Sequence, residues 1–190
     1  MKGVVMTHIQ ARFSTLLDSL THKTCPIHQS VWVSPQDLPF SAEVRGMCEA
    51  NRCGKYGTSW SCPPGCGDWE ALRDEFYTCK AAFVFTTCHA LEDSFDIEGI
   101  QAAAENHQKL DDEIATALAQ TDLSHIHLGM GTCHLCETCT YPDAPCRHPD
   151  KMRRPPEACG IDVCSMSKAI GIKYMNGPDT VTYFSVLLFR

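Results

Sequence analysis

The segment VTYFSVLLF, residues 181–189, is dense in β-branched and aromatic side chains and predicts a strand at the end of the chain. The run AAFVFTT, residues 81–87, predicts a second strand, and its apolar character indicates that this strand is buried. Weaker strand patterns occur at residues 30–34 and 125–130. A sheet made from these segments is therefore expected at the centre of the fold.

Helical patterns occupy much of the chain between these strands. Apolar residues recur at helical spacing in residues 8–21, 69–76 and 98–120, and a further helix is expected to end at Gly171. Asp68 and Asp162 precede two of these helices and are predicted to be their N-caps. His107 falls on the apolar stripe of the helix over 98–120 and is predicted to be a core histidine rather than a metal ligand.

Strands that alternate with helices indicate an α/β or α+β fold. We expect a single compact domain with a mixed sheet, flanking helices and two cysteine-rich metal-binding loops. This domain spans residues 1–190 and divides into an N-terminal helix and strand (1–43), a first cysteine loop (44–67), a helix and strand scaffold (68–132), a second cysteine loop (133–154) and a C-terminal helix and strand (155–190).

Charge and hydropathy exclude two classes of partner. The chain has 16 Lys and Arg against 23 Asp and Glu, and this acidic balance argues against general binding to nucleic acid, which requires clustered cations. No apolar run is long enough to span a membrane, and the first residues, MKGVVMTHIQARF, lack the apolar core of a signal peptide. We therefore expect a cytoplasmic protein that binds neither nucleic acid nor membranes.

Thirteen cysteines are the strongest chemical signal in the sequence. An odd number cannot pair completely, and a cytoplasmic protein keeps its thiols reduced, so metal binding is the favoured use. The sharpest motif is Cys133-x2-Cys136-x2-Cys139-x6-Cys146. Closely spaced cysteines of this kind suit a 4Fe–4S cluster, in which each thiolate binds a different iron, while zinc is the less favoured alternative.

A second motif, Cys48-x4-Cys53-x8-Cys62-x3-Cys66, lies upstream among several glycines and the pair Pro63-Pro64. The region from 48 to 67 has no usable periodicity and is expected to be an ordered loop. It predicts a second cluster, although its cysteines could instead complete one shared site or hold a zinc ion. Cys66 is the least certain ligand of this set.

Basic residues gather around the second motif at Arg147, His148, Lys151, Arg153 and Arg154. Cations there would stabilise a negatively charged cluster, or they could simply form a solvated loop. They could also bind a small anionic substrate or an acidic redox partner protein. The sequence leaves these alternatives open, and it does not require an oligomer.

The linked motifs resemble those of a bacterial and archaeal family of predicted metal-binding proteins, which is classed as a domain of unknown function. The resemblance rests on C-x4-C-G-x-Y-G-x2-W-x-C-P-P (48–64), C-x2-C-x2-C…P-C-R-x-P (133–149) and EACGIDV (157–163). It covers the chain from about Val44 onward and implies a metal site, which is iron–sulfur in character, and frequent occurrence in anaerobes. Cys66 falls outside the family pattern, which would leave an iron with an exchangeable position.

Three functions follow as hypotheses. The favoured one is an iron–sulfur protein that transfers electrons to a partner in anaerobic metabolism, since no dinucleotide or nucleotide phosphate motif is present. The first alternative is an enzyme that uses an incompletely ligated cluster for substrate activation or sulfur chemistry, with Cys66 or a nearby histidine as its working group. The second alternative is a structural or interaction module folded by zinc.

Overall fold

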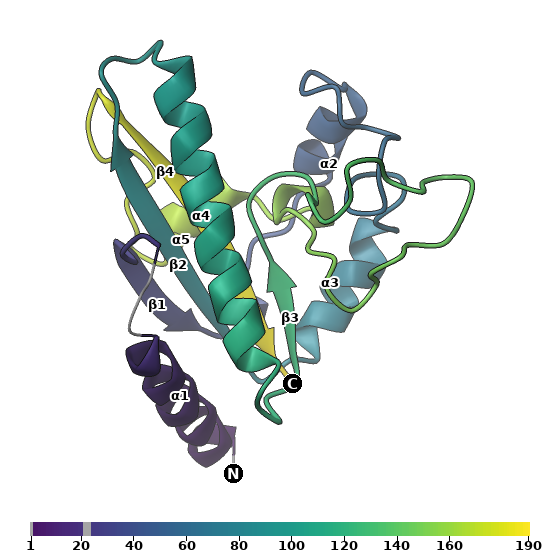
Figure 1. Ribbon diagram of the computed structural model, residues 1–190. Coiled ribbons are helices and arrows are strands. Elements are labelled where there is room, and N and C mark those ends of the chain that lie inside the picture. Colours follow the sequence, from purple (N-terminus) through teal and green to yellow (C-terminus); the bar gives the residue numbers. More distant parts are fainter. Residues whose placement is uncertain (1, 21–23) are drawn as a thin grey trace.

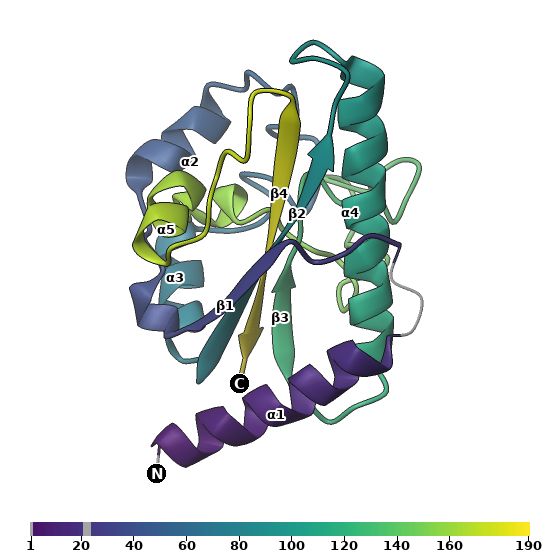
Figure 2. The same ribbon diagram turned by 90° about the vertical axis from the view of Figure 1, so that its left-hand side faces the viewer.

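The computed structural model describes residues 2–20 and 24–190 and has an α+β fold (Figure 1). A four-stranded sheet lies between two groups of helices. Helices α1 (Lys2–Ser19) and α4 (Ile97–Leu118) cover one face, whereas α3 (Trp69–Tyr77) and α5 (Val163–Ala169) cover the other (Figure 2). The last residue of the helix predicted over 8–21 lies outside the described residues. No helix among the described residues combines the length and apolar character that crossing a bilayer requires.

The strands are β1 (Gln29–Val33), β2 (Ala81–Ala90), β3 (His125–Leu128) and β4 (Thr180–Phe189), in the order β1-β2-β4-β3. Strands β2 and β4 form the centre and pair along their whole length, from Ala81 opposite Phe189 to Ala90 opposite Thr180. Both strands coincide with the strongest strand patterns in the sequence.

The prediction of a mixed sheet was wrong, because all three strand pairs are antiparallel. Helix α4 returns the chain across the sheet, so β2 and β3 run in the same direction, as in a crossover unit. The C-terminal strand β4 then inserts between them and runs opposite to both. The insertion separates the two parallel strands, and no parallel ladder forms between named strands.

Each face of the sheet has its own apolar core. On the side of α1 and α4, the Phe13 ring lies 5.0 Å from Phe83 and 5.1 Å from Phe189, measured between centroids. On the other side, Phe76 and Met166 are completely buried against the sheet. This division leaves α1, α3 and α4 with one buried stripe each, as the helical spacing predicted.

Both predicted N-caps are confirmed. The Asp68 carboxylate accepts a hydrogen bond from the Ala71 amide at 2.9 Å, and the Asp162 carboxylate accepts one from the Ser165 amide at 2.9 Å. The prediction for His107 is also confirmed, since its side chain is fully buried and bonded to Thr87 and Ser185.

The prediction of a loop from residue 48 was wrong at its start. Cys48 lies in the last turn of α2 (Ala42–Glu49), which Ser41 caps by accepting a hydrogen bond from the Glu43 amide at 3.1 Å. None of the residues in α2 is buried, and the helix has only eight residues, fewer than the window over which apolar periodicity identifies a helix. Turns and bends without regular structure continue to Gly67.

Candidate metal centre

The four cysteines of the second motif line one small hollow. Cys133, Cys136, Cys139 and Cys146 are all half-buried and face this space together with Trp60. They belong to residues 133–152, which form turns and bends without a helix or strand. The spacing that suggested a cluster in the sequence therefore corresponds to four thiols around a common space.

Residues of the first motif hold the second motif in position. The Trp60 indole donates a hydrogen bond to the Ala144 carbonyl at 3.1 Å, and its ring meets the Tyr141 ring edge-on at 4.9 Å. The Cys133 amide donates to the Ser61 hydroxyl at 3.0 Å. A Cβ at Gly65 would lie 2.9 Å from the Tyr141 ring, so only glycine permits this close approach. The two cysteine motifs thus pack side by side.

Backbone amides point at the sulfurs of the second motif. The His148 amide donates to Cys146 Sγ at 3.4 Å. Burial raises the pKa of the Cys133 thiol, while hydrogen bonds from the Leu135 and Arg153 amides act in the opposite direction. Amide donors of this kind stabilise thiolates and tune the potential of iron–sulfur clusters.

Three cysteines of the first motif face a different and much larger space. Cys48, Cys53 and Cys62 line a cleft of about 860 Å³, within the usual range for ligand pockets. Cys66 does not line it. The Cys66 thiol is buried, donates to the Ala158 carbonyl at 3.4 Å and accepts from the Arg45 guanidinium at 3.5 Å.

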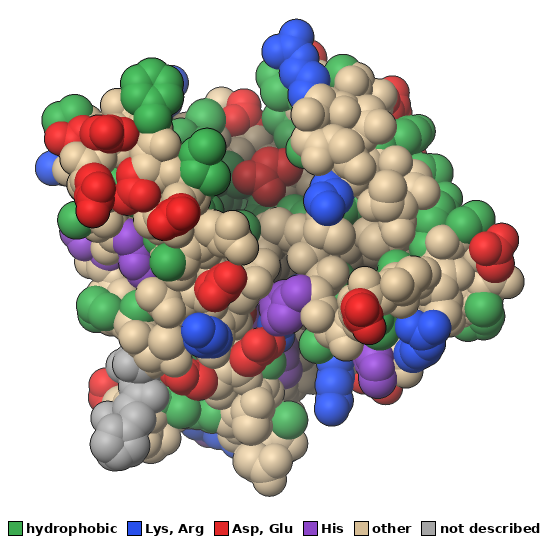
Figure 3. Space-filling view, turned by 45° about the horizontal axis from the view of Figure 1, so that its top comes forward, with side chains coloured by type: hydrophobic (Ala, Val, Ile, Leu, Met, Phe, Trp, Pro, Cys, Tyr) green, Lys and Arg blue, Asp and Glu red, His purple; other side chains and the backbone are tan. Residues whose placement is uncertain are grey.

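The opposite wall of this cleft comes from η2 (Glu157–Cys159), α5 and the start of β4. Figure 3 looks into this side of the molecule, where hydrophobic and acidic side chains lie inside a recess. Glu157 is accessible to solvent but surrounded by the walls of the cleft, and this burial raises the pKa of its carboxyl group. Cys133 lines both the cleft and the small hollow, so the two spaces adjoin at this residue.

The donor chemistry of these sites fits a thiolate-bound metal centre. Across the part of the chain that the structure describes, no three His, Cys, Asp or Glu side chains converge closely enough to hold a single ion. The hollow at the second motif measures about 20 Å³, so its walls would have to move apart to admit a cluster. Cys133, Cys136, Cys139 and Cys146 are the residues that would hold it.

Comparison with known proteins agrees with the cysteine pattern. The model of the family described as "Predicted metal-binding protein (DUF2284)" matches residues 31–189, which include all of the sheet except the first two residues of β1, and both cysteine motifs. The chain belongs to this family. The resemblance inferred from the motifs is therefore confirmed, and the family's description names no particular metal. No curated protein and no solved structure matches the chain significantly.

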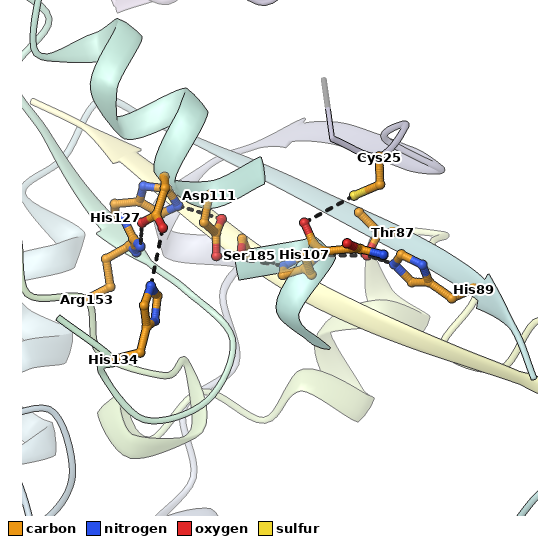
Figure 4. Close-up of polar contacts among 11 residues, drawn as sticks. Cys25, Thr87, His89, His107, Asp111, His127, His134, Arg153 and Ser185 are labelled. Carbon is orange, nitrogen blue, oxygen red and sulfur yellow. Dashed lines mark hydrogen bonds and ion pairs between the residues drawn. The ribbon is translucent and has the colours of Figure 1, made fainter. Parts of the chain in front are cut away.

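This DUF2284 chain also contains a buried polar network that the sequence analysis missed (Figure 4). It crosses the face of the sheet below α4. His89 Nε2 lies 2.9 Å from Thr87 Oγ1, which lies 2.7 Å from His107 Nδ1. His107 Nε2 in turn lies 2.9 Å from Ser185 Oγ.

The network ends at a carboxylate and a further imidazole. The Ser185 hydroxyl donates to Asp111 Oδ2 at 2.9 Å, and His127 Nε2 donates to Asp111 Oδ1 at 2.8 Å. Two features of the sequence could have indicated this network. His107 and Asp111 are four residues apart on the helix, and Ser185 interrupts the apolar strand.

The electrostatics of the network follow from its burial. Burial lowers the pKa of His107 to about 4, so its ring is neutral near pH 7. Burial acts to raise the pKa of Asp111, but the nearby charge of His127 and hydrogen bonds from His127 and Ser185 outweigh it and lower this pKa. The carboxylate is therefore ionised within an otherwise apolar layer.

These shifts predict that the protein loses stability in mild acid. Unfolded His107 binds a proton below about pH 6.5, whereas the folded state binds it only near pH 4, so acid favours unfolding in this window. We expect the free energy of unfolding to fall by about 3 kcal/mol across it because of His107. Urea denaturation at a series of pH values measures this change. His107→Gln should flatten the profile and the exposed-site variant His28→Gln should not, and equal slopes in both would contradict the assignment.

Proposed function

We propose that this protein is an iron–sulfur protein that binds a 4Fe–4S cluster through Cys133, Cys136, Cys139 and Cys146 and transfers electrons to a partner. The single observation that carries the proposal is that these four thiols border one hollow. Each thiolate of a cubane binds a different iron, so the ligands must surround a volume rather than a point.

Two further features support electron transfer. Trp60 and Tyr141 pack beside the hollow and would limit the access of water to a cluster, which influences its potential. Arg147, His148 and Lys151 are exposed next to it. Exposed cations near a redox centre would steer an acidic redox partner or a small anionic substrate toward it.

Metal and sulfide content tests this proposal directly. Protein purified without oxygen should contain about four irons and four acid-labile sulfides for one cluster, or about eight of each for two. Its visible absorption should bleach on addition of dithionite. Zinc without sulfide would overturn the proposal in favour of a zinc-folded module.

A second candidate function is an enzyme that activates a substrate at the first motif. The observation that favours it is the separation of Cys66 from Cys48, Cys53 and Cys62, which alone among the four line the large cleft. A cluster held by three thiolates would have an exchangeable position facing this cleft. Glu157 lies in the same cleft, and its raised pKa suits a group that exchanges protons with a substrate.

Paired substitutions test the first motif. Cys66→Ala is expected to keep the full metal content, because the Cys66 thiol does not line the cleft and is hydrogen-bonded to Ala158 and Arg45. Cys62→Ala, the matched variant at an equally buried position, is expected to lose the metal of this motif. Iron analysis of both proteins, with circular dichroism as the check on folding, distinguishes the two. Loss of iron in Cys66→Ala would make Cys66 a ligand and contradict the open position.

A further inference from the structure

One atom of the buried network lacks a partner. Two buried side-chain polar atoms among the described residues make no hydrogen bond, Nδ1 of His127 and Nε of Arg154. The His127 side chain is only 5% exposed, and its other nitrogen is fixed on Asp111. An unpaired polar atom is costly inside a protein, so its retention points to a functional role.

The network determines which protons its members carry. Because the Ser185 hydroxyl donates to Asp111, Ser185 must accept from His107 Nε2, and His107 Nδ1 must then accept from the Thr87 hydroxyl. His127 likewise carries a proton on Nε2, which it donates to the Asp111 carboxylate. Nδ1 is consequently the nitrogen that is free to accept a proton.

This pair lies next to the second cysteine motif. Asp111 and Cys133 line the same small cavity. Arg153 connects them, because its backbone amide acts on the Cys133 thiol and its side chain passes over Gly129 beside the Asp111 carboxylate. A Cβ at Gly129 would lie 2.8 Å from Asp111 Oδ2 and 3.4 Å from Arg153 Nε. The Gly129 backbone and the side chains of Asp111 and Arg153 are therefore in close contact.

His127 also lines an open groove of about 840 Å³ along β3. Most charged side chains that line this groove form ion pairs. Arg190 pairs with Glu75 at 2.6 Å, and Asp112 pairs with both Arg153 and His134. The remaining titratable and charged groups that line the groove are His125, Asp150, Lys151 and Arg154, while His107 and Asp111 face His127 from α4 on its buried side.

We propose that His127 takes up a proton on Nδ1 when the metal centre at the second cysteine motif is reduced. The inference rests on the proposed function. One electron from the reductant enters the centre, and one proton from solvent binds the free imidazole nitrogen, so the added negative charge is compensated. An added unit charge nearby is expected to shift the proton-binding equilibrium of the imidazole by about tenfold.

The test is the reduction potential as a function of pH. Full-length protein purified without oxygen is titrated with dithionite between about pH 6 and 9, a range that brackets ordinary histidine titration. As the pH rises through this range, the potential should fall by about 59 mV in total, which is the value of a tenfold shift in proton binding for a one-electron couple. His127→Gln should hold the same iron and sulfide but show a potential that is independent of pH. The matched control His125→Gln, two residues away on β3, should retain the slope.

Each outcome decides the question. A slope that persists in His127→Gln, or a wild-type potential independent of pH, overturns the proposal while leaving the iron–sulfur function intact. Absence of any reducible centre overturns the proposed function and this inference with it. If His127→Gln does not fold, ¹⁵N NMR of histidine-labelled wild type replaces it. Nδ1 of His127 should gain a proton on reduction at constant pH, and an unchanged protonation state would refute the inference.

Discussion

Replacing Asp111 by alanine is expected to lower the free energy of unfolding by about 3 kcal/mol, the largest loss that we expect from removing one polar side chain. The carboxylate is 1% exposed and accepts hydrogen bonds from His127 and Ser185. Its removal leaves both donors buried without a partner, and the unfolded state regains their hydration. Urea denaturation at neutral pH measures the difference.

The neighbouring residue provides a matched control. Asp112 is 46% exposed and pairs with Arg153 and His134 at the surface. Surface ion pairs contribute about 1 kcal/mol or less, so Asp112→Ala should change stability little. If Asp111→Ala and Asp112→Ala lowered the free energy of unfolding by similar amounts, the loss would not come from the buried network.

The second large effect concerns metal content. Cys139→Ser is expected to remove essentially all iron and sulfide from the second motif, because three remaining thiolates in a segment without regular structure hold a cluster poorly. Hydroxyl oxygen is a harder and much weaker ligand for iron–sulfur centres than thiolate. The measurement is iron and sulfide analysis after purification without oxygen, together with the visible spectrum.

Cys164→Ser is the control for this substitution. Cys164 is exposed and lies outside both motifs, in α5. Its replacement should leave iron, sulfide and spectrum unchanged. Retention of a full cluster in Cys139→Ser would mean that another residue completes the coordination, and the assignment of four ligands at the second motif would be wrong.

The adjoining spaces at Cys133 connect the two candidate functions. The small hollow is lined by the four cysteines proposed to hold a cluster, and the large cleft is lined by Cys48, Cys53, Cys62 and Glu157. A chain with both would bring electrons from the second motif to a substrate at the first. The metal content of Cys62→Ala and Cys139→Ser together would show whether the two motifs load independently.

Much of the fold was predictable from local patterns. The strands β2 and β4 carry continuous apolar runs, and Asp68 and Asp162 cap their helices through short-range hydrogen bonds. Features of this kind depend on neighbours along the chain, so the sequence contains all the information they need. Helix α2 escaped prediction because its eight residues are too few to show a helical period.

The cysteine motifs also combine features that local sequence predicts with features that it does not. Their spacing by itself predicts ligands for a metal centre, and the chain's membership of a family of predicted metal-binding proteins agrees with a metal centre. Spacing did not reveal that Cys66 turns away toward Arg45 and Ala158 while its three companions face the cleft. That difference depends on contacts with residues 21 and 92 positions away along the chain, which no motif records.

The sequence by itself determined the main strands, the two aspartate caps and most of the helices, because each of these arises from interactions between near neighbours, and its cysteine spacing predicts the ligand sets. Only the tertiary structure decided the antiparallel order of the sheet, the packing of the two cysteine motifs side by side and the network from His89 to His127. These features join residues from separate strands and helices. Their formation depends on how the insertion of β4 and the crossing of α4 bring distant polar groups together inside the protein, where an unpaired group is costly and a complete network is stable.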